Sequence, residues 1–473
     1  TFELVRGEWR TYLQDLSNPN APPSINGTLD ITSVNIEENG DRQPVNYILP
    51  PGITRMTDPS QPQLRQQNEQ ALSLRLTSLP SGDAQDARAI YKKTNYDMRR
   101  YKRLQLFVHA EKFINDVTSL NNGELSVFLR LGSDYKNNYY EYEVPLNLTP
   151  AGHYNNSSEN DRQTVWPAEN MIDFRMEVLT NLKMRRNRAR REGQSDVSFA
   201  RLYSEYDPDR QLNKISVIGN PSLAEVKTIM IGVRNNSKDI KSGEIWVNEL
   251  RMTDFDEQGG WAANGALSIA LSDFGTFNAT GHIETAGFGR IDQSIGERNM
   301  DDYLQYAVST SMQLGKFFPE KAQVHLPLHY AYSRETVSPQ YNPLDQDVKL
   351  NDALGLLDSK AEKDSLKSLS QQQVTTKSIA LNNVQVNIKS KNPMPYDPAN
   401  FSMSYAYNER KRTDPETVYE TTKNYQGNLS YVYTPYAKPF QPFENIEKNN
   451  GYTRYIKQFA LNYLPSNISF QTS

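Results

Sequence analysis

Cysteine is absent from the 473 residues of this chain, which excludes a disulfide, a thiolate nucleophile or a cysteine-based zinc site. Long apolar runs are absent too, and none approaches the roughly 18 consecutive apolar residues of a membrane-spanning helix. The net charge is only −4. Because no strong basic field is available to displace counterions, a general nucleic-acid-binding role is disfavoured.

Sequence signatures of enzymes are lacking as well: there is no G-x-S-x-G, no H-E-x-x-H and no Walker loop. Histidine is scarce, at 5 residues. His325 and His329 are four residues apart, a spacing that puts both on one face of a strand, but no third metal ligand stands near; His109 is most simply a strand residue. We therefore expect a protein that is not an enzyme, with no cofactor and no metal site.

Aromatic residues, in contrast, are plentiful, with Tyr 28, Phe 17 and Trp 4, although the mean hydropathy is −0.73. A polar chain so rich in tyrosine must place its apolar residues by alternation, which predicts a mainly β protein.

Short strands dominate residues 86–255, for example at 101–111, 123–133, 138–148, 225–235 and 243–252. Their alternation and their separation by turns predict a jelly-roll-like β-sandwich domain. Residues 1–85 are less regular, and we expect an irregular β or extended segment there.

A helix is predicted at 166–192, where Met171, Phe174, Val178 and Leu182 recur at helical spacing. Its end, residues 183–191, is basic. These cations suit the C-terminal dipole of a surface helix; contact with anionic lipid or another polyanion is the alternative.

From residue 256 to residue 473 one pattern repeats: roughly eight or nine strands of about 9–14 residues alternate between apolar and small polar side chains. A strand is predicted as far along the chain as Phe459, Leu461 and Tyr463, followed by a turn at 465–467, and a polar loop or short helix is predicted at 351–373. Strands in soluble sandwiches average about 5–6 residues, whereas outer-membrane barrels combine about ten alternating residues with aromatic ends and a polar interior.

The alternation predicts two faces. The apolar set is expected to face lipid: Leu267, Ile269, Leu271, Phe277, Ile283, Leu304, Tyr306, Val308, Met312, Leu314, Leu326, Leu328, Tyr405, Leu429, Tyr431, Phe459 and Leu461. The polar set is expected to face a water-filled lumen: Ser268, Ser272, Thr276, Asn278, Thr280, Gln305, Ser309, Ser311, Gln313, His325, His329, Ser402, Ser404, Asn428 and Ser430. The same alternation would also suit a large secreted β-sandwich or solenoid, and that alternative stays open.

Four long stretches, RRYKRLQLFVHAE, SGEIWVNELRMTDFDEQGGWAANGALSIALSDF, LGKFFPEK and YNPLDQDVKL, closely resemble the SprA/Sov family, the outer-membrane translocons of the Bacteroidota type IX secretion system. The resemblance implies transmembrane β-barrel wall strands that form part of a very large barrel, following an inserted sandwich domain. It also implies a protein-conducting pore that exports folded cargo proteins bearing a C-terminal signal, in a system linked to gliding motility.

Further partners follow from this resemblance: a PorV-type shuttle barrel, a plug protein, outer-membrane lipid and the rest of the same polypeptide. The first residues, TFELVRGEWRTYLQ, contain no apolar signal-peptide core, and we expect an internal fragment of a longer chain in the cell outer membrane. Without a nucleotide-binding signature, transport would be passive guidance.

A second hypothesis is a cell-surface glycan-binding or adhesive β-sandwich protein. It depends on a cluster of Asp134, Tyr135, Tyr139, Tyr140 and Tyr142, whose aromatic rings could stack on sugars.

Overall fold

The computed structural model describes residues 9–12, 16, 27–55, 57, 66–81, 86–388, 390, 393–435, 438–445 and 451–473. The chain forms two compact units. The first, called here the sandwich unit, comprises 1–257 and 344–356; the second, the wall unit, comprises 258–343 and 357–473. The segment 344–356 therefore leaves the wall unit and returns to the sandwich unit.

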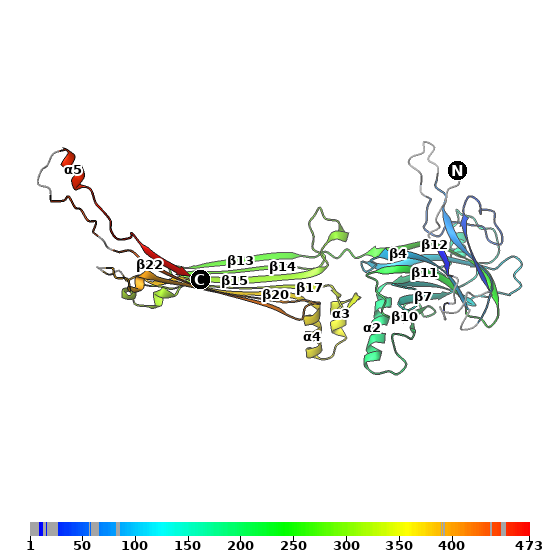
Figure 1. Ribbon diagram of the computed structural model, residues 1–473. Coiled ribbons are helices and arrows are strands. Elements are labelled where there is room, and N and C mark those ends of the chain that lie inside the picture. Colours follow the sequence, from blue (N-terminus) through cyan, green and yellow to red (C-terminus); the bar gives the residue numbers. More distant parts are fainter. Residues whose placement is uncertain are drawn as a thin grey trace. The chain divides into compact units, whose positions relative to one another are not determined.

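Two antiparallel sheets make up the sandwich unit (Figure 1). The seven-stranded sheet has the order β1 (Arg10–Tyr12), β4 (Ala87–Tyr96), β11 (Val226–Asn235), β6 (Leu125–Gly132), β7 (Tyr139–Pro145), β10 (Lys214–Ile218), β9 (Tyr203–Tyr206). The five-stranded sheet has the order β2 (Thr28–Asn35), β3 (Gln70–Leu79), β12 (Lys241–Phe255), β5 (Tyr101–Glu111), β8 (Ile172–Arg175).

The connections between these sheets are those of a jelly roll. Take β3, β4, β5, β6, β7, β8, β11 and β12 as the first to eighth strands. One sheet then has the order first, eighth, third, sixth, and the other second, seventh, fourth, fifth. This is the arrangement of two Greek keys in a double-sheet jelly roll. The predicted sandwich is therefore present.

Residues 27–79 were expected to lie outside this sandwich, and that expectation is wrong. β2 and β3 are strands of the five-stranded sheet, with Ile31 opposite Leu74 and Leu74 opposite Ile245. Their alternation buries Leu74 and Leu76 completely, which explains why they join the sheet. The segment 1–8 lies outside the described residues.

The core of the sandwich unit lies between the two sheets, where inward residues of both are buried, such as Leu129 and Ile231 on one sheet and Leu106 and Ile245 on the other. A second apolar layer, with Tyr47, Trp166 and Trp246, covers the outer side of the five-stranded sheet. His109 belongs to this layer: its ring stacks on that of Trp246 at 4.0 Å between centroids.

The helices of the sandwich unit are α1 (Glu159–Val165), α2 (Glu177–Arg191) and α3 (Leu350–Gly355), and the returning segment also contributes strand β19 (Asp345–Lys349). The helix predicted at 166–192 is thus too long. In β8, Ile172 and Phe174 are buried while Asp173 and Arg175 point outward. This alternation of every second residue is that of a strand, and the helix begins only at Glu177.

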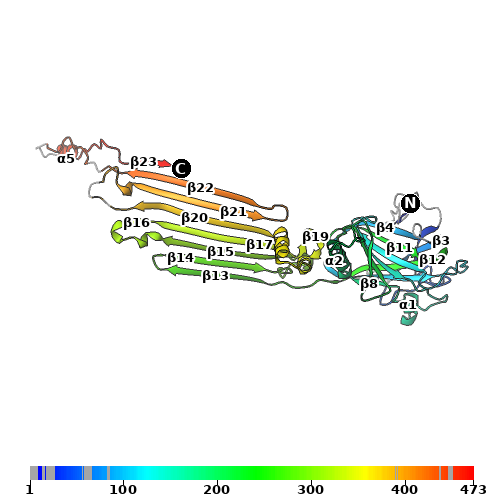
Figure 2. The ribbon, with the colours of Figure 1, turned by 90° about the horizontal axis from the view of Figure 1, so that it is seen from below.

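The wall unit is built on one antiparallel, nine-stranded sheet, whose strands lie side by side in Figure 2. The order is β13 (Ala262–Leu271), β14 (Gly275–Glu284), β15 (Asp301–Gln313), β17 (Pro327–Pro339), β20 (Gln372–Val386), β21 (Phe401–Thr413), β22 (Glu420–Tyr433), β23 (Ile468–Thr472), and β16 (Val324–His325) pairs with β20. The remaining elements are β18 (Tyr341–Asn342), α4 (Lys360–Ser370), α5 (Gly451–Lys457), and 3-10 helices at Ile295–Glu297, Leu314–Phe317, Glu320–Ala322 and Pro398–Asn400.

Two local expectations for this unit change. The polar region 351–373 contains α3 and α4, and α4 begins with a capping box in which Ser359 and Glu362 exchange hydrogen bonds. The strand predicted through Phe459, Leu461 and Tyr463 is wrong: these residues follow helix α5, and an isolated bridge from Phe440 to Leu461 is the pairing found there, while β23 begins at Ile468. Tyr452, Tyr455 and Ile456, at spacings of three and four, have helical rather than alternating order.

Candidate functional site: a two-faced sheet

The strand register of the wall unit sorts side chains onto two faces. Directly opposed residues of an antiparallel ladder share a face, so one row runs from Leu267 through Ala279 and Val308 to Tyr332. The predicted apolar residues that lie in paired strands all fall on this side: Leu267, Ile269, Leu271, Phe277, Ile283, Leu304, Tyr306, Val308, Met312, Leu328, Tyr405, Leu429 and Tyr431. We call this side the apolar face.

No other part of the described residues buries this face. Leu267 is 54% exposed and Leu304 44% exposed, whereas Leu129 in the sandwich core is 1% exposed. The register places further residues on this face: Tyr330, Tyr332, Ile379, Leu381, Met403, Tyr407 and Tyr425. A contiguous exposed apolar surface of this kind marks contact with lipid or with another protein.

The opposite side, the polar face, carries small hydroxyl and amide side chains. Its central rows pass through Ser268, Asn278, Ser309, Ala331, Ser378, Asn408 and Asn424. Neighbours bond across strands: the Ser268 hydroxyl donates to Asn278 Oδ1 at 2.7 Å, and Ser378 donates to Asn408 Oδ1 at 2.7 Å. The row through these residues bears no charged side chain; the charged residues of the same face, among them Glu335, Arg410 and Arg412, lie in rows nearer one end of the strands.

The apolar band crosses the strands obliquely. On β15 it extends from Leu304 to Met312, but Leu304 lies opposite Thr336 of β17, which in turn lies opposite Gln373 of β20. On β21 and β22 the band has moved toward the other end, where Met403 opposes Leu429. On β15 the band from Leu304 to Met312 covers eight residue steps. At about 3.4 Å per step and a strand tilt of about 40°, these steps would rise roughly 21 Å, compared with an apolar band ~25 Å tall in membrane barrels.

A β-bulge on β20 preserves the two-faced order. The register shifts between Leu381, opposite Tyr405, and Val384, opposite Met403. Asn383 takes a left-handed φ of 53° there, and its N–H donates to the hydroxyl of Ser404 at 2.9 Å. The extra residue keeps both Leu381 and Val384 on the apolar face, although they are three positions apart.

Some predicted face residues lie outside the paired strands. Ser272 is in the turn after β13, Leu314 is in a 3-10 helix, Leu326 separates β16 from β17, and Phe459 and Leu461 follow α5. His325 lies in β16 opposite Gln385, while His329 lies in β17, where its Nδ1 bonds the Ser311 hydroxyl at 3.0 Å.

In the sandwich unit, the returning segment 344–356 is held by a buried charge cluster. The Lys183 ammonium is fully buried and pairs with Asp347 at 3.0 Å and with Asp345. Asp347 also accepts hydrogen bonds from the Tyr140 hydroxyl at 2.7 Å and the Leu223 N–H at 3.1 Å.

Burial shifts the pKa of two groups in this cluster, Tyr140 and Asp345. Burial and the charge of Asp347 raise the pKa of Tyr140 well above its ordinary value, so Tyr140 remains a donor. Burial raises the pKa of Asp345 as well; Asp347 acts in the same direction, and Lys183 opposes both. Asp345 and Asp347 share one ammonium; Asp347 is fully buried, whereas the side chain of Asp345 is 17% exposed.

This cluster was missed by sequence reasoning, yet a signal existed. On α2, Lys183 and Arg186 occupy the same helical stripe as Leu179 and Leu182, and a cation in an apolar stripe requires a buried partner. The basic run predicted at 183–191 is therefore partly buried and partly exposed. Lys183 and Arg186 are buried, and Arg186 donates to the carbonyl of Gly219 at 2.6 Å, whereas Arg188 is exposed.

The tyrosine cluster of the glycan hypothesis offers no stacking platform. Tyr139, Tyr140 and Tyr142 are all buried within the sandwich unit. Tyr142 stacks on Phe174, and the ring of Tyr139 lies 4.2 Å from the guanidinium of Arg130. That hypothesis loses three of its four aromatic rings; the fourth, Tyr135, is half-buried and packs against Tyr12 and Tyr91.

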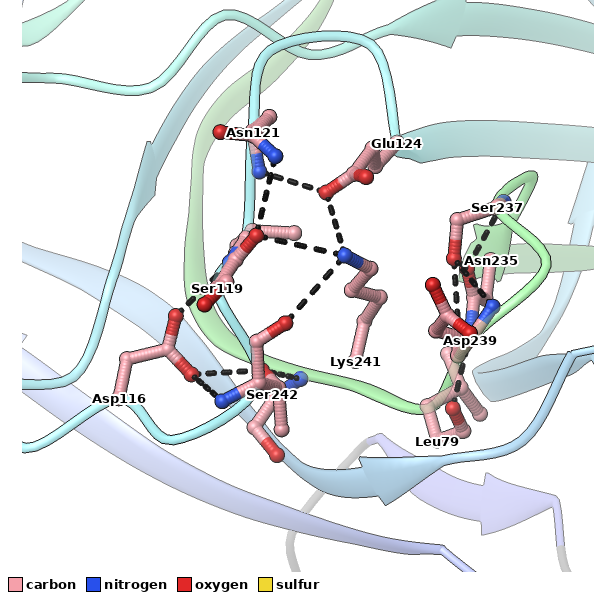
Figure 3. A network of polar contacts seen from close by, with 12 residues as sticks. Leu79, Asp116, Ser119, Asn121, Glu124, Asn235, Ser237, Asp239, Lys241 and Ser242 are labelled. Carbon is pink, nitrogen blue, oxygen red and sulfur yellow. Dashed lines mark hydrogen bonds and ion pairs between the residues drawn. The ribbon is translucent and has the colours of Figure 1, made fainter.

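A cavity of about 1130 Å³ opens elsewhere on the sandwich unit, beside the loop that follows β5. Figure 3 shows how this loop is ordered: the Lys241 ammonium bonds Glu124 at 2.8 Å and the carbonyl of Ser119 at 3.3 Å. Asp116 accepts hydrogen bonds from the Thr118 hydroxyl and from the N–H groups of Leu120 and Thr118. Burial raises the pKa of Asp116, but these hydrogen bonds prevail and hold it below the ordinary value.

None of the helices in the described part of the chain is long and apolar enough to cross a membrane. Among the same residues, no group of three or more His, Asp or Glu side chains is placed to hold a metal ion.

Comparison with known proteins identifies the family. The model of a family described as motility related/secretion protein, SprA_N, matches residues 1–354. No curated protein matches the chain. Since the family match spans the whole jelly roll, the returning segment to residue 354 and the first wall strands, the chain belongs to the SprA family of motility-related and secretion proteins.

Proposed function

We propose that the wall unit is part of the wall of a protein-conducting outer-membrane pore, a type IX secretion translocon that exports folded cargo proteins. The observation that carries this proposal is the two-faced sheet: its oblique apolar band is exposed along one side, while its other side is polar and carries no charge in its central row. Long tilted strands with this division are typical of membrane barrels.

The polar face supplies the transport surface. Ser, Thr, Asn and Gln side chains bind water and present neither apolar patches nor strong charges to a passing protein. Cargo of different surface composition would therefore slide past without strong attraction, and the wall would guide rather than drive it. The apolar face would contact outer-membrane lipid.

Other strands must complete the wall. Among the described residues β13 pairs only with β14, and in lipid an unpaired strand edge costs several kcal/mol for each unsatisfied backbone group. We expect further strands of the same polypeptide at this edge. A PorV-type shuttle barrel and a plug protein, the partners that the family resemblance implies, are proposed for the complete assembly.

Photo-crosslinking during export tests the proposal. A crosslinking amino acid at Ser309, on the polar face, is expected to capture exported cargo in the full-length protein. The same residue at Val308, one position away on the apolar face, is expected to give lipid adducts and no cargo. Absence of cargo adducts from Ser309, Ala331 and Asn408 alike, in cells that export normally, would contradict the proposal.

A further inference from the structure

Four cations gather at one end of the apolar face, on β17, β20, β21 and β22. Arg334 opposes Thr375, two residues before Lys377. Lys377 opposes Glu409, and Glu409 in turn opposes Lys423. The fourth cation, Lys411, lies two residues beyond Glu409 on the same strand, and therefore on the same face.

Internal pairing does not neutralise this group. In the described part of the chain, the ion pair found within this group joins Glu409 to Lys411 at 3.1 Å. Arg334 donates to the neutral amide oxygen of Gln373 at 2.8 Å. The side chain of Lys411 is 55% exposed, and Lys423 is exposed too, so the surplus positive charge faces outward.

The position of the group is equally specific. Tyrosines border the cations on the same face. Tyr407 and Tyr425 form the next row, with their rings 5.0 Å apart. Tyr306 lies opposite Arg334 and Tyr332 opposite Lys377, with the two tyrosine rings 6.1 Å apart. The Tyr407 hydroxyl donates to Glu409 at 3.0 Å. Apolar band, tyrosines and cations thus follow one another along the strands, the order that places tyrosine and basic residues at the level of lipid headgroups.

We infer that Arg334, Lys377, Lys411 and Lys423 form a binding site for the phosphate of anionic lipid headgroups. Neighbouring strands are about 4.8 Å apart, so two or three of these cations can reach one headgroup. Charge-assisted hydrogen bonds to phosphate oxygens are strong, and basic residues at a membrane surface attract anionic lipid. The inference rests on the proposed function, in which this face meets lipid.

Native mass spectrometry of the full chain in detergent, with phosphatidylglycerol or phosphatidylcholine added, tests the site. The wild-type chain is expected to retain phosphatidylglycerol in preference to phosphatidylcholine. Lys377→Gln with Lys423→Gln is expected to lower phosphatidylglycerol retention by about five-fold per charge removed, and added salt is expected to weaken it. Retention of phosphatidylcholine should not change.

Arg410→Gln is the matched control, because Arg410 is an exposed cation next to Glu409 and Lys411 but lies on the polar face. It is expected to leave lipid preference unchanged. Equal retention of both lipids by the wild type, or an equal loss in the control, would overturn the headgroup site. Failure of the wild type to retain any lipid would instead overturn the proposed lipid-facing role.

Discussion

Replacing Val308 with arginine is expected to lower the free energy of unfolding in lipid by about 2–4 kcal/mol, the cost of arginine on the lipid face near the bilayer midplane. Val308 is central on β15, between Ala279 of β14 and Tyr332 of β17. Leu271 is the last residue of β13, beside a turn. An arginine at this position would lie nearer the membrane interface, and its cost in unfolding free energy would be lower than at Val308. Urea titration of the full-length protein in vesicles measures the effect.

Ser309→Arg provides the control. Ser309 is the next residue on the same strand, is similarly half-buried, and lies on the polar face opposite Asn278 and Ala331. Here the guanidinium would enter water, and we expect a change in the unfolding free energy of about 0.5 kcal/mol or less. Equal destabilisation by both substitutions would mean that β15 has no lipid-facing side.

Lys183→Met is expected to destabilise the sandwich unit by about 3–5 kcal/mol, because it leaves Asp345 and Asp347 buried without their cation. The returning segment should then detach locally, so the amides of 345–350 should exchange hydrogen faster. Denaturant unfolding and hydrogen exchange of the full chain measure the two effects.

Arg188→Met, on the exposed side of the same helix, removes only a surface pair with Glu192 and should cost about 0–1 kcal/mol. Combining Lys183→Met with Asp345→Asn and Asp347→Asn removes all the charges and should recover part of the lost stability. If Lys183→Met changed neither unfolding nor exchange at 345–350, the cluster would not anchor the segment.

The two faces of the wall unit were predictable because strand periodicity is a local signal. Residues two apart share a face wherever the strand continues, so Leu304, Val308 and Ser309 sorted correctly from spacing alone. The prediction fails where the strand ends, as at Leu326 and Phe459. Alternation of apolar and polar residues does not show whether a partner strand lies beside them.

Burial in the sandwich unit was harder to predict, because it depends on contacts distant in the sequence. Tyr140 and Tyr142 alternate with acidic residues and resemble an exposed strand end, yet they lie in the core, and Tyr140 bonds Asp347 from more than 200 residues away. Lys183 reaches the same carboxylate across 164 positions. No local period reveals such a pairing.

Thiol accessibility along β15 tests the central claim most directly. The chain contains no cysteine, so single replacements carry no background label from this sequence. In the full-length protein in its native membrane, a water-soluble maleimide is expected to label cysteines at Ala307, Ser309 and Ser311, and to spare those at Tyr306, Val308 and Thr310. Labelling at both sets of positions, or only at the second, would contradict a sheet with one lipid-facing side and one water-facing side.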